Sequence, residues 1–190
     1  MNFSAVILAG GKSSRMGRDK AFLEIAGISL LARQIETVRA AGAAEVFISG
    51  RLGVDYSAFN CDLLLDQFPD AGPLAGIAVA LAVAAHPMVL VLAVDLPAVN
   101  AAFLRRLRTG CTEKVGTIPR VDGYLEPLVA FYPQAAHVVA EKMLAAHSFV
   151  AKDFACGCVR SGLGVFEDLP AADSANFKNC NSPSDLPCLI

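Results

Sequence analysis

The residues best suited to chemistry gather near the start of the chain, where an apolar run leads into a segment rich in glycine and cations. Residues 6–20 read Val-Ile-Leu-Ala-Gly-Gly-Lys-Ser-Ser-Arg-Met-Gly-Arg-Asp-Lys. The cations of this segment are Lys12, Arg15, Arg18 and Lys20, opposed only by Asp19. Glycines let backbone N–H groups approach a ligand closely, and cations neutralise phosphate charge. The segment therefore predicts a loop that grips a polyphosphate.

The spacing of this segment excludes the two common phosphate loops. A Walker loop ending at Gly11-Lys12-Ser13 needs a glycine where the chain has Val6, and the glycines also miss the dinucleotide-binding spacing. A flexible basic surface loop is the alternative. The coincidence of a strand, glycines and cations favours phosphate binding.

Composition predicts one globular domain over residues 1–190. The chain is 55% hydrophobic and carries a net charge of −2, so its basic character is local and no nucleic-acid partner is expected. The uncharged stretch Leu74–Val94 is split by His86-Pro87 into a helix and a buried strand, so no membrane segment is expected. The N-terminus lacks a secretory pattern, which favours the cytoplasm.

The cysteines and histidines do not predict a metal site. Cys156-Gly-Cys158 has the form of half a site, but no second pair has ligand spacing. We expect the six cysteines to be reduced thiols, buried or at the surface.

Apolar runs alternate with helical patterns along the chain. The strands are expected at 3–8, 45–48, 62–65, 88–94, 114–118, 128–132 and 177–179, and the helices at 29–41, 74–85, 100–108 and 134–146. Gly42 is expected to end the first helix and Pro73 to begin the second, whereas residues 148–175 give no clear pattern. The alternation predicts a three-layer α/β fold with a mostly parallel sheet and helices on both faces. Ligands of such folds bind at the carboxyl ends of the strands.

Polar residues follow several of the expected strands. Ser49 and Asp66 each stand at a strand end, and Asp95-Leu96-Pro97 follows a buried strand. A carboxylate held by a proline turn can bind a hard cation, or it can form an N-cap or a turn. Opposite a phosphate loop, Asp95 is predicted to bind Mg²⁺.

Three further polar residues are candidates for the second substrate. Glu126 lies at the edge of the expected sheet and either positions a substrate or ends a surface turn. Asn179 and Asn181 alternate, so in an extended strand both amides face one way and could bind a polar heterocycle. Their alternative role is to cap a helix starting near Pro183.

Several motifs, taken in order along the chain, resemble those of molybdenum cofactor guanylyltransferases. They are Leu8-Ala9-Gly10-Gly11-x-Ser13-x-Arg15-Met16-Gly17-x-Asp19-Lys20, Gly72-Pro73-Leu74-Ala75-Gly76, Asp95-x-Pro97, Glu126-Pro127-Leu128 and Asn179-Cys180-Asn181-Ser182-Pro183-Ser184-Asp185-Leu186. The first motif is highly specific, and together they span almost the whole chain. The resemblance implies a glycosyltransferase-A-like nucleotidyltransferase that joins GMP from GTP to the phosphate of molybdopterin and releases pyrophosphate.

The resemblance also implies a set of site residues. Leu8, Ala9, Gly10, Lys20 and Asp66 are implied to line the nucleotide site, Asp95 to bind Mg²⁺ beside the nucleotide, and Asn179 and Asn181 to lie on the pterin side. From their positions in the sequence we add Gly11 and Ser49 to the nucleotide-binding residues and Glu126 to the acceptor-binding residues. Ser49 stands where some relatives have an asparagine. Partner proteins that deliver the cofactor or receive it, among them the recipient molybdoenzyme, are compatible with this role.

The expected chemistry is attack by a phosphate monoester on the α-phosphorus of GTP. Such a nucleophile is already anionic at neutral pH, so no general base is required. Arg15 and Lys20, with Asp95, are the predicted catalytic residues, because the protein must position two anions and stabilise the leaving pyrophosphate. Lys12 and Arg18 either steer the ligand or face solvent.

Two other functions remain open from sequence. A cytidylyltransferase of the same cofactor or a sugar-nucleotide pyrophosphorylase is one, although Gly10 in place of a second alanine favours guanine. A non-catalytic nucleotide-binding adaptor is the other, and the presence of both Lys20 and Asp95 argues against it.

Overall fold

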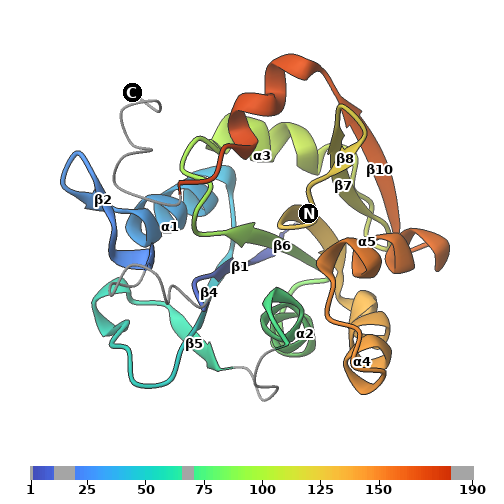
Figure 1. The fold of residues 1–190 in the computed structure, drawn as a ribbon, viewed down its shortest axis with the longest axis horizontal. Coiled ribbons are helices and arrows are strands. Elements are labelled where there is room, and N and C mark those ends of the chain that lie inside the picture. The colour runs from blue at the N-terminus through green and yellow to red at the C-terminus, as the bar shows by residue number, and fades with distance from the viewer. Residues whose placement is uncertain (1, 11–19, 66–70, 181–190) are drawn as a thin grey trace.

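A five-stranded sheet lies at the centre of the computed structural model, which describes residues 2–10, 20–65 and 71–180 (Figure 1). Its strands, in spatial order, are β5 (Asp62–Leu65), β4 (Glu45–Gly50), β1 (Ser4–Leu8), β6 (Met88–Ala93) and β9 (Val129–Pro133). The first four are parallel, and β9 is antiparallel to β6. The register pairs Leu8 with both Ser49 and Ala93, so the carboxyl ends of β1, β4 and β6 meet at one edge.

Helices cover both faces of this sheet and enclose two hydrophobic cores. One face carries α1 (Leu30–Ala41) and α3 (Ala101–Arg108); the other carries α2 (Pro73–Val83), α4 (His137–Ala145) and α5 (Ala151–Arg160) (Figure 1). Alternation along β1 supplies both cores: Phe3, Ala5 and Ile7 face α1 and α3, whereas Val6 faces α2. The predicted three-layer, mostly parallel α/β fold is confirmed.

Local sequence explains where three of the helices begin and end. Ser29 and Asn100 cap α1 and α3, each accepting a hydrogen bond from the backbone three residues on. Gly42 ends α1 in the left-handed conformation, as predicted. Gly72, with φ of +61°, turns the chain into α2, where Pro73 occupies the first turn.

A smaller sheet packs beside β9. It contains β10 (Gly164–Leu169), β7 (Gly116–Val121) and β8 (Tyr124–Leu125), with β10 parallel and β8 antiparallel to β7. The approach to β9 is close, because a Cβ at Gly116 would lie 2.0 Å from the Phe131 carbonyl oxygen. The remaining elements are the hairpin β2 (Glu24–Ile25) and β3 (Ile28–Ser29), and the 3₁₀ helices η1 (Lys20–Phe22), η2 (Ser57–Phe59), η3 (Gln134–Ala136) and η4 (Ala171–Phe177).

The strand expected at 177–179 is wrong. Phe177 ends the 3₁₀ helix η4, and residues 178–180 belong to no strand. The apolar Phe177 packs edge-on against Phe103, with ring centroids 5.6 Å apart, and the Cys180 N–H donates to the Asp95 carbonyl. Tertiary contacts with α3 and the Asp95 turn therefore replace strand pairing.

Two smaller expectations also change. The helix expected over 134–146 divides into η3 and α4, and residues 148–175, which gave no clear pattern, contain α5 and β10. In the part of the chain that the structure describes, no helix has the length and apolar character needed to span a membrane.

Candidate active site

The carboxyl-end edge of the sheet brings three predicted site segments together. The Ala9 N–H donates to the Ser49 carbonyl at 2.8 Å, and the Val94 N–H donates to the Leu8 carbonyl at 3.2 Å. These bonds extend the pairing of β1 with β4 and β6 beyond the strand ends. Leu8, Ala9, Ser49 and the start of the Asp95 turn therefore lie side by side.

Lys20 and Asp95 face each other at this edge although they are far apart in sequence. The Lys20 Nζ lies 3.4 Å from Asp95 Oδ2, and the side chains are 26% and 24% exposed. A partly exposed ion pair of this kind is worth roughly 0–1 kcal/mol, so a ligand can displace it at little cost. Both charges are thus held in place and remain available to an anion and a cation, respectively.

The Ser49 side chain lies under α2. Ser49 is only 5% exposed, and a Cβ added at Gly76 would lie 2.2 Å from its Oγ and 3.2 Å from Leu8 Cδ2. Gly76 is therefore required for the first turns of α2 to approach the ends of β1 and β4. The positive end of the α2 dipole is thereby brought to the edge where phosphates are expected.

Gly10 continues this edge from β1. A Cβ at Gly10 would lie 3.5 Å from the Gly50 carbonyl oxygen, an ordinary van der Waals contact. No described residue therefore excludes alanine at position 10. The predicted need for glycine rests on close approach of a ligand to the backbone.

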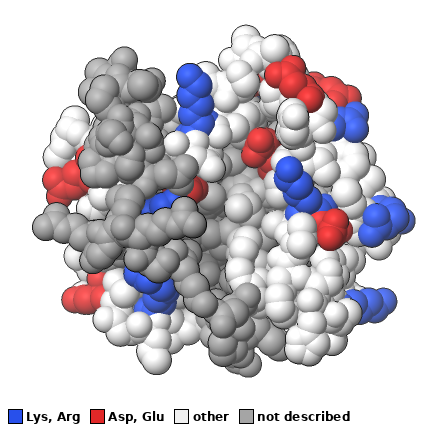
Figure 2. Space-filling view, viewed as in Figure 1, with Lys and Arg blue, Asp and Glu red and all other residues white. Residues whose placement is uncertain are grey.

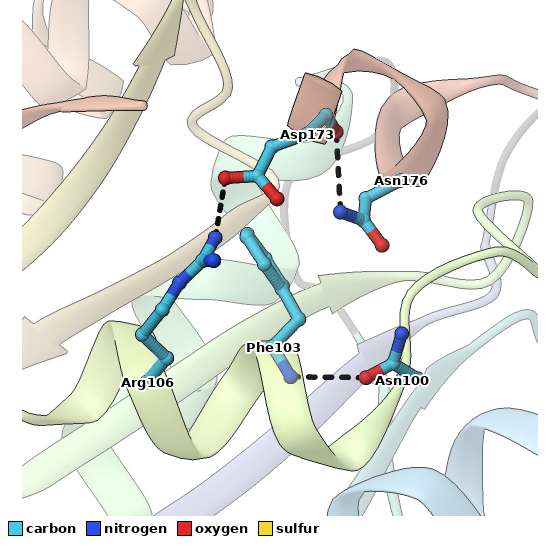
Figure 3. Close-up of polar contacts among 5 residues, drawn as sticks. All are labelled: Asn100, Phe103, Arg106, Asp173 and Asn176. Carbon is cyan, nitrogen blue, oxygen red and sulfur yellow. Dashed lines mark hydrogen bonds and ion pairs between the residues drawn. The ribbon is translucent and has the colours of Figure 1, made fainter. Parts of the chain in front are cut away.

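The segment carrying Asn179 is attached to α3, the helix that follows the Asp95 turn. Figure 3 shows Arg106 of α3 paired with Asp173 of η4, while Asn176 donates to the Asp173 carbonyl at 3.1 Å. The Arg106 guanidinium also lies over the Phe103 ring, which contacts Phe177. These contacts lead the chain back toward the Asp95 turn.

The end of this segment touches the Asp95 turn directly. Cys180 is fully buried, and its N–H donates to the Asp95 carbonyl at 2.8 Å. Asn179, one residue earlier, is exposed. The predicted acceptor residue Asn179 is thus next in sequence to a residue bonded to the predicted metal ligand.

Glu126 lies between β8 and β9, near the end of β6. Its N–H donates to the Pro119 carbonyl at 2.9 Å, and two residues later the Leu128 carbonyl accepts from the Ala93 N–H at 2.8 Å. Burial raises the pKa of Glu126, and the charge of Lys152 partly opposes that rise. The carboxylate is held where its ionised form is disfavoured, a common property of residues in binding sites.

Glu126→Gln is expected to increase thermal stability at neutral pH. When folding raises the pKa of a carboxyl, the folded state loses stability as pH rises from about 4.3, the unfolded value, to the raised folded value, and the loss stays constant above it. Glutamine removes this loss, and the difference in midpoint of thermal unfolding between variant and wild type should disappear at pH values below the unfolded value. Thermal unfolding from acidic to neutral pH measures it. A variant less stable than wild type at neutral pH, and equal to it in acid, would contradict the burial effect.

The described residues hold no group of three or more His, Cys, Asp or Glu side chains arranged as a metal site. Burial raises the pKa of the Cys158 thiol to about 12, which makes it a poor ligand and nucleophile. Within the same part of the chain, the free thiols are Cys61, Cys111, Cys156, Cys158 and Cys180.

A single carboxylate such as that of Asp95 is enough to bind Mg²⁺ beside a nucleotide, because this ion commonly uses one or two carboxylates together with substrate phosphates and water.

Several predicted residues lie outside the described ranges. They are Gly11, Lys12, Arg15, Arg18, Asp66 and Asn181.

Gln34 contacts the Asp95 turn and was not predicted from the sequence. Its Nε2 donates to the Leu96 carbonyl at 2.7 Å. The available signal was a polar residue at a core-facing position of a helix, flanked by Leu30, Leu31, Ile35 and Val38.

Solved structures with the same arrangement define the class. A nucleotidyl transferase from Methanothermobacter superposes with a TM-score of 0.78 at 19% identity, covering 98% of this chain and 95% of that one. Molybdopterin-guanine dinucleotide biosynthesis protein A from Archaeoglobus fulgidus gives 0.73 at 23% identity, covering 98% and 96%. The fold is therefore that of nucleotidyltransferases.

Sequence similarity identifies the family within this class. The profile of the MobA-like NTP transferase domain matches residues 5–152. A probable molybdenum cofactor guanylyltransferase from Opitutus terrae is 39% identical over 186 residues, covering 96% of this chain and 92% of the relative. The chain belongs to the MobA-like NTP transferase family and is a nucleotidyltransferase, as its motifs predicted.

Proposed function

We propose that this enzyme transfers GMP from GTP to the phosphate of molybdopterin, forming the guanine dinucleotide cofactor and pyrophosphate. The observation that carries the proposal is the Lys20–Asp95 pair at the carboxyl ends of the strands. It presents one cation and one carboxylate where a ligand of this fold class binds. Relatives named molybdenum cofactor guanylyltransferase support the choice of nucleotide and acceptor.

The reaction exchanges one phosphate ester bond for another. An acceptor phosphate oxygen attacks the α-phosphorus of GTP, and the bond from that phosphorus to the bridging oxygen of pyrophosphate breaks. The nucleophile is already anionic, so no proton must be removed. The chain's task is to position two anions and balance the negative charge of the leaving group.

Lys20 is proposed to bind the phosphates of GTP. Its ammonium is a mobile point charge that can exchange Asp95 for a phosphate oxygen. Arg15 is proposed to share this task from the same glycine-rich segment. Leu8, Ala9, Gly10, Gly11, Ser49 and Asp66 are proposed to line the nucleotide site, where the Ser49 carbonyl accepts from the Ala9 N–H.

Asp95 is proposed to hold Mg²⁺, the divalent ion that best suits a carboxylate beside phosphates. The bound ion supplies positive charge against the phosphate oxygens. The partly exposed Asp95 carboxylate and the displaceable Lys20 contact fit this role. Asp95 thus both binds the ion and holds Lys20 before the nucleotide arrives.

The acceptor is proposed to lie against Glu126, Asn179 and Asn181. Asn179 is exposed beside the segment bonded to Asp95, and Glu126 lies close to the end of β6. Amides and a carboxylate can hydrogen-bond a polar heterocycle such as a pterin. We place the reaction in the cytoplasm, where a recipient molybdoenzyme can take up the product.

Calorimetric titration of GTP, CTP and ATP in the presence of Mg²⁺ tests the nucleotide assignment. GTP is expected to bind most tightly, and CTP binding more tightly than GTP would support a cytidylyltransferase instead.

Pyrophosphate release that depends on molybdopterin distinguishes a catalyst from a nucleotide-binding adaptor. Asn179→Ala is the acceptor-side control: it should keep the GTP dissociation constant of wild type while turnover falls.

A further inference from the structure

The turn that carries Asp95 is held by hydrogen bonds from three separate parts of the chain. The Val94 N–H donates to the carbonyl of Leu8 on β1, at 3.2 Å. The Asp95 carbonyl accepts from the Cys180 N–H at 2.8 Å, and the Leu96 carbonyl accepts from Gln34 Nε2 at 2.7 Å. Two successive backbone carbonyls, those of Asp95 and Leu96, thus accept hydrogen bonds from residues outside the turn.

Gln34 is an unusual residue for its position. It lies on the core side of α1, is 1% exposed, and its Oε1 is buried with no hydrogen-bond partner among the described residues. A buried unpaired oxygen reduces stability, and a methionine or leucine of similar size would avoid that loss. Packing alone therefore does not explain an amide at this position.

The Leu96 carbonyl would have a hydrogen-bond donor even without Gln34. The Leu96 carbonyl also accepts from the Val99 N–H at 3.2 Å, which closes the turn by itself. The amide therefore adds a second donor to a group that already has one. Its effect is to fix the direction of the turn relative to α1.

We infer that Gln34 is a positioning residue, which acts through the Leu96 carbonyl to hold the Asp95 carboxylate in the direction that binds the divalent ion. This inference rests on the proposed metal role of Asp95. Holding the backbone on both sides of a ligand limits the orientations of its side chain. Groups that hydrogen-bond directly to a metal ligand commonly change metal affinity 10–100-fold when they are removed; Gln34 acts through the next residue, so the lower end of this range is expected.

Gln34→Met tests the inference, with Gln134→Met as the matched control. Gln134 is a second glutamine whose Nε2 donates to a backbone carbonyl, that of Ala84, at 2.8 Å. It lies at the opposite end of the sheet, beside Pro133, which pairs with the first residue of β6. Both variants lose one bond from a side-chain amide to a backbone carbonyl, which is buried at Gln34 and partly buried at Gln134, but only Gln34→Met loses one at the Asp95 turn.

Three measurements are made on the chain of residues 1–190. They are the dissociation constant of Mn²⁺ in the presence of GTP, from electron paramagnetic resonance; hydrogen exchange over residues 94–99; and the midpoint of thermal unfolding. Gln34→Met is expected to bind Mn²⁺ about tenfold more weakly than wild type and to exchange faster over 94–99. Its unfolding midpoint should stay close to that of wild type, because losing the unpaired Oε1 offsets the lost bond.

A purely structural role gives a different pattern. It lowers the unfolding midpoint and leaves Mn²⁺ affinity at the value of Gln134→Met, which would overturn the inference. Asp95→Asn measured alongside separates this failure from that of the proposed function. If Asp95→Asn binds Mn²⁺ weakly and Gln34→Met binds it as wild type does, the role of Gln34 is wrong and the metal role of Asp95 stands. If Asp95→Asn itself binds Mn²⁺ as wild type does, both roles are wrong.

Discussion

Asp95→Asn is expected to keep the fold and to lower turnover on the order of a thousandfold, which corresponds to about 4 kcal/mol of activation free energy. Asparagine has the shape of aspartate but cannot balance the charge of a divalent ion. The backbone hydrogen bonds of this turn, from the Cys180 N–H to the Asp95 carbonyl and from the Val94 N–H to the Leu8 carbonyl, do not involve the carboxylate and should persist. The only described ion-pair partner lost is Lys20, in a partly exposed pair that contributes little to stability.

The measurement is kcat with saturating GTP, molybdopterin and Mg²⁺, together with the midpoint of thermal unfolding. Asp168→Asn is a suitable control, since Asp168 also pairs with a cation, Arg120, at 2.6 and 2.7 Å, on the distant strand β10. The control should turn over at the wild-type rate. Asp95→Asn turnover within about threefold of wild type, less than 1 kcal/mol, would remove Asp95 from the metal site.

The main sheet could be predicted because its signals are local. Strands such as β1 and β6 are short apolar runs, and the ends of α1 and α2 carry Gly42 and Pro73, residues whose backbone preferences fit those positions. Asp95 follows a fully buried strand, so its location at the carboxyl edge followed from the parallel topology. The position of Asp95 at this edge could therefore be predicted from the sequence.

Elements without such signals were missed. The helix α5 begins at Ala151 after Val150, which offers no side-chain cap, and contains Gly157. The strand β10 is partly exposed, with Val165 at 46%, so it lacks clear alternation between buried and exposed residues. In both cases packing against other elements, rather than local preference, decides the structure.

The missed site contacts have a different cause. Gln34 and Leu96 are 62 residues apart, and Cys180 reaches the Asp95 turn only after η4 packs on α3. Such contacts depend on how elements meet in three dimensions. The apolar Phe177 could be read as part of a strand, whereas its actual neighbour, Phe103, lies on a helix far away in sequence.

Gly76→Ala is expected to destabilise the enzyme by about 1–3 kcal/mol, as overpacking of a core typically does, and to weaken GTP binding. The new methyl group would lie 2.2 Å from Ser49 Oγ, which can rotate, and 3.0 Å from Ser49 Cβ, which cannot, so α2 must shift slightly away from β4. The N-terminus of α2 would then withdraw from the edge where the phosphates of GTP are proposed to bind. Thermal unfolding and the GTP dissociation constant measure the two effects.

The double variant Ser49→Gly with Gly76→Ala tests whether this contact is the cause. Glycine at position 49 removes both atoms that the methyl group meets most closely, so the effects of the two single variants should not add, and the double variant should recover part of the GTP affinity lost by Gly76→Ala. Gly157→Ala is the control in another helix, because the same substitution in α5 meets, among the described residues, Val139 Cγ1 at 3.0 Å and the end of the Arg160 side chain at 3.8 Å, with no contact under 3.0 Å. Alanine favours a helix over glycine by about 1 kcal/mol, so this control should be neutral or stabilising. If Gly76→Ala behaves like Gly157→Ala in both measurements, α2 does not depend on a glycine to reach the edge of the sheet.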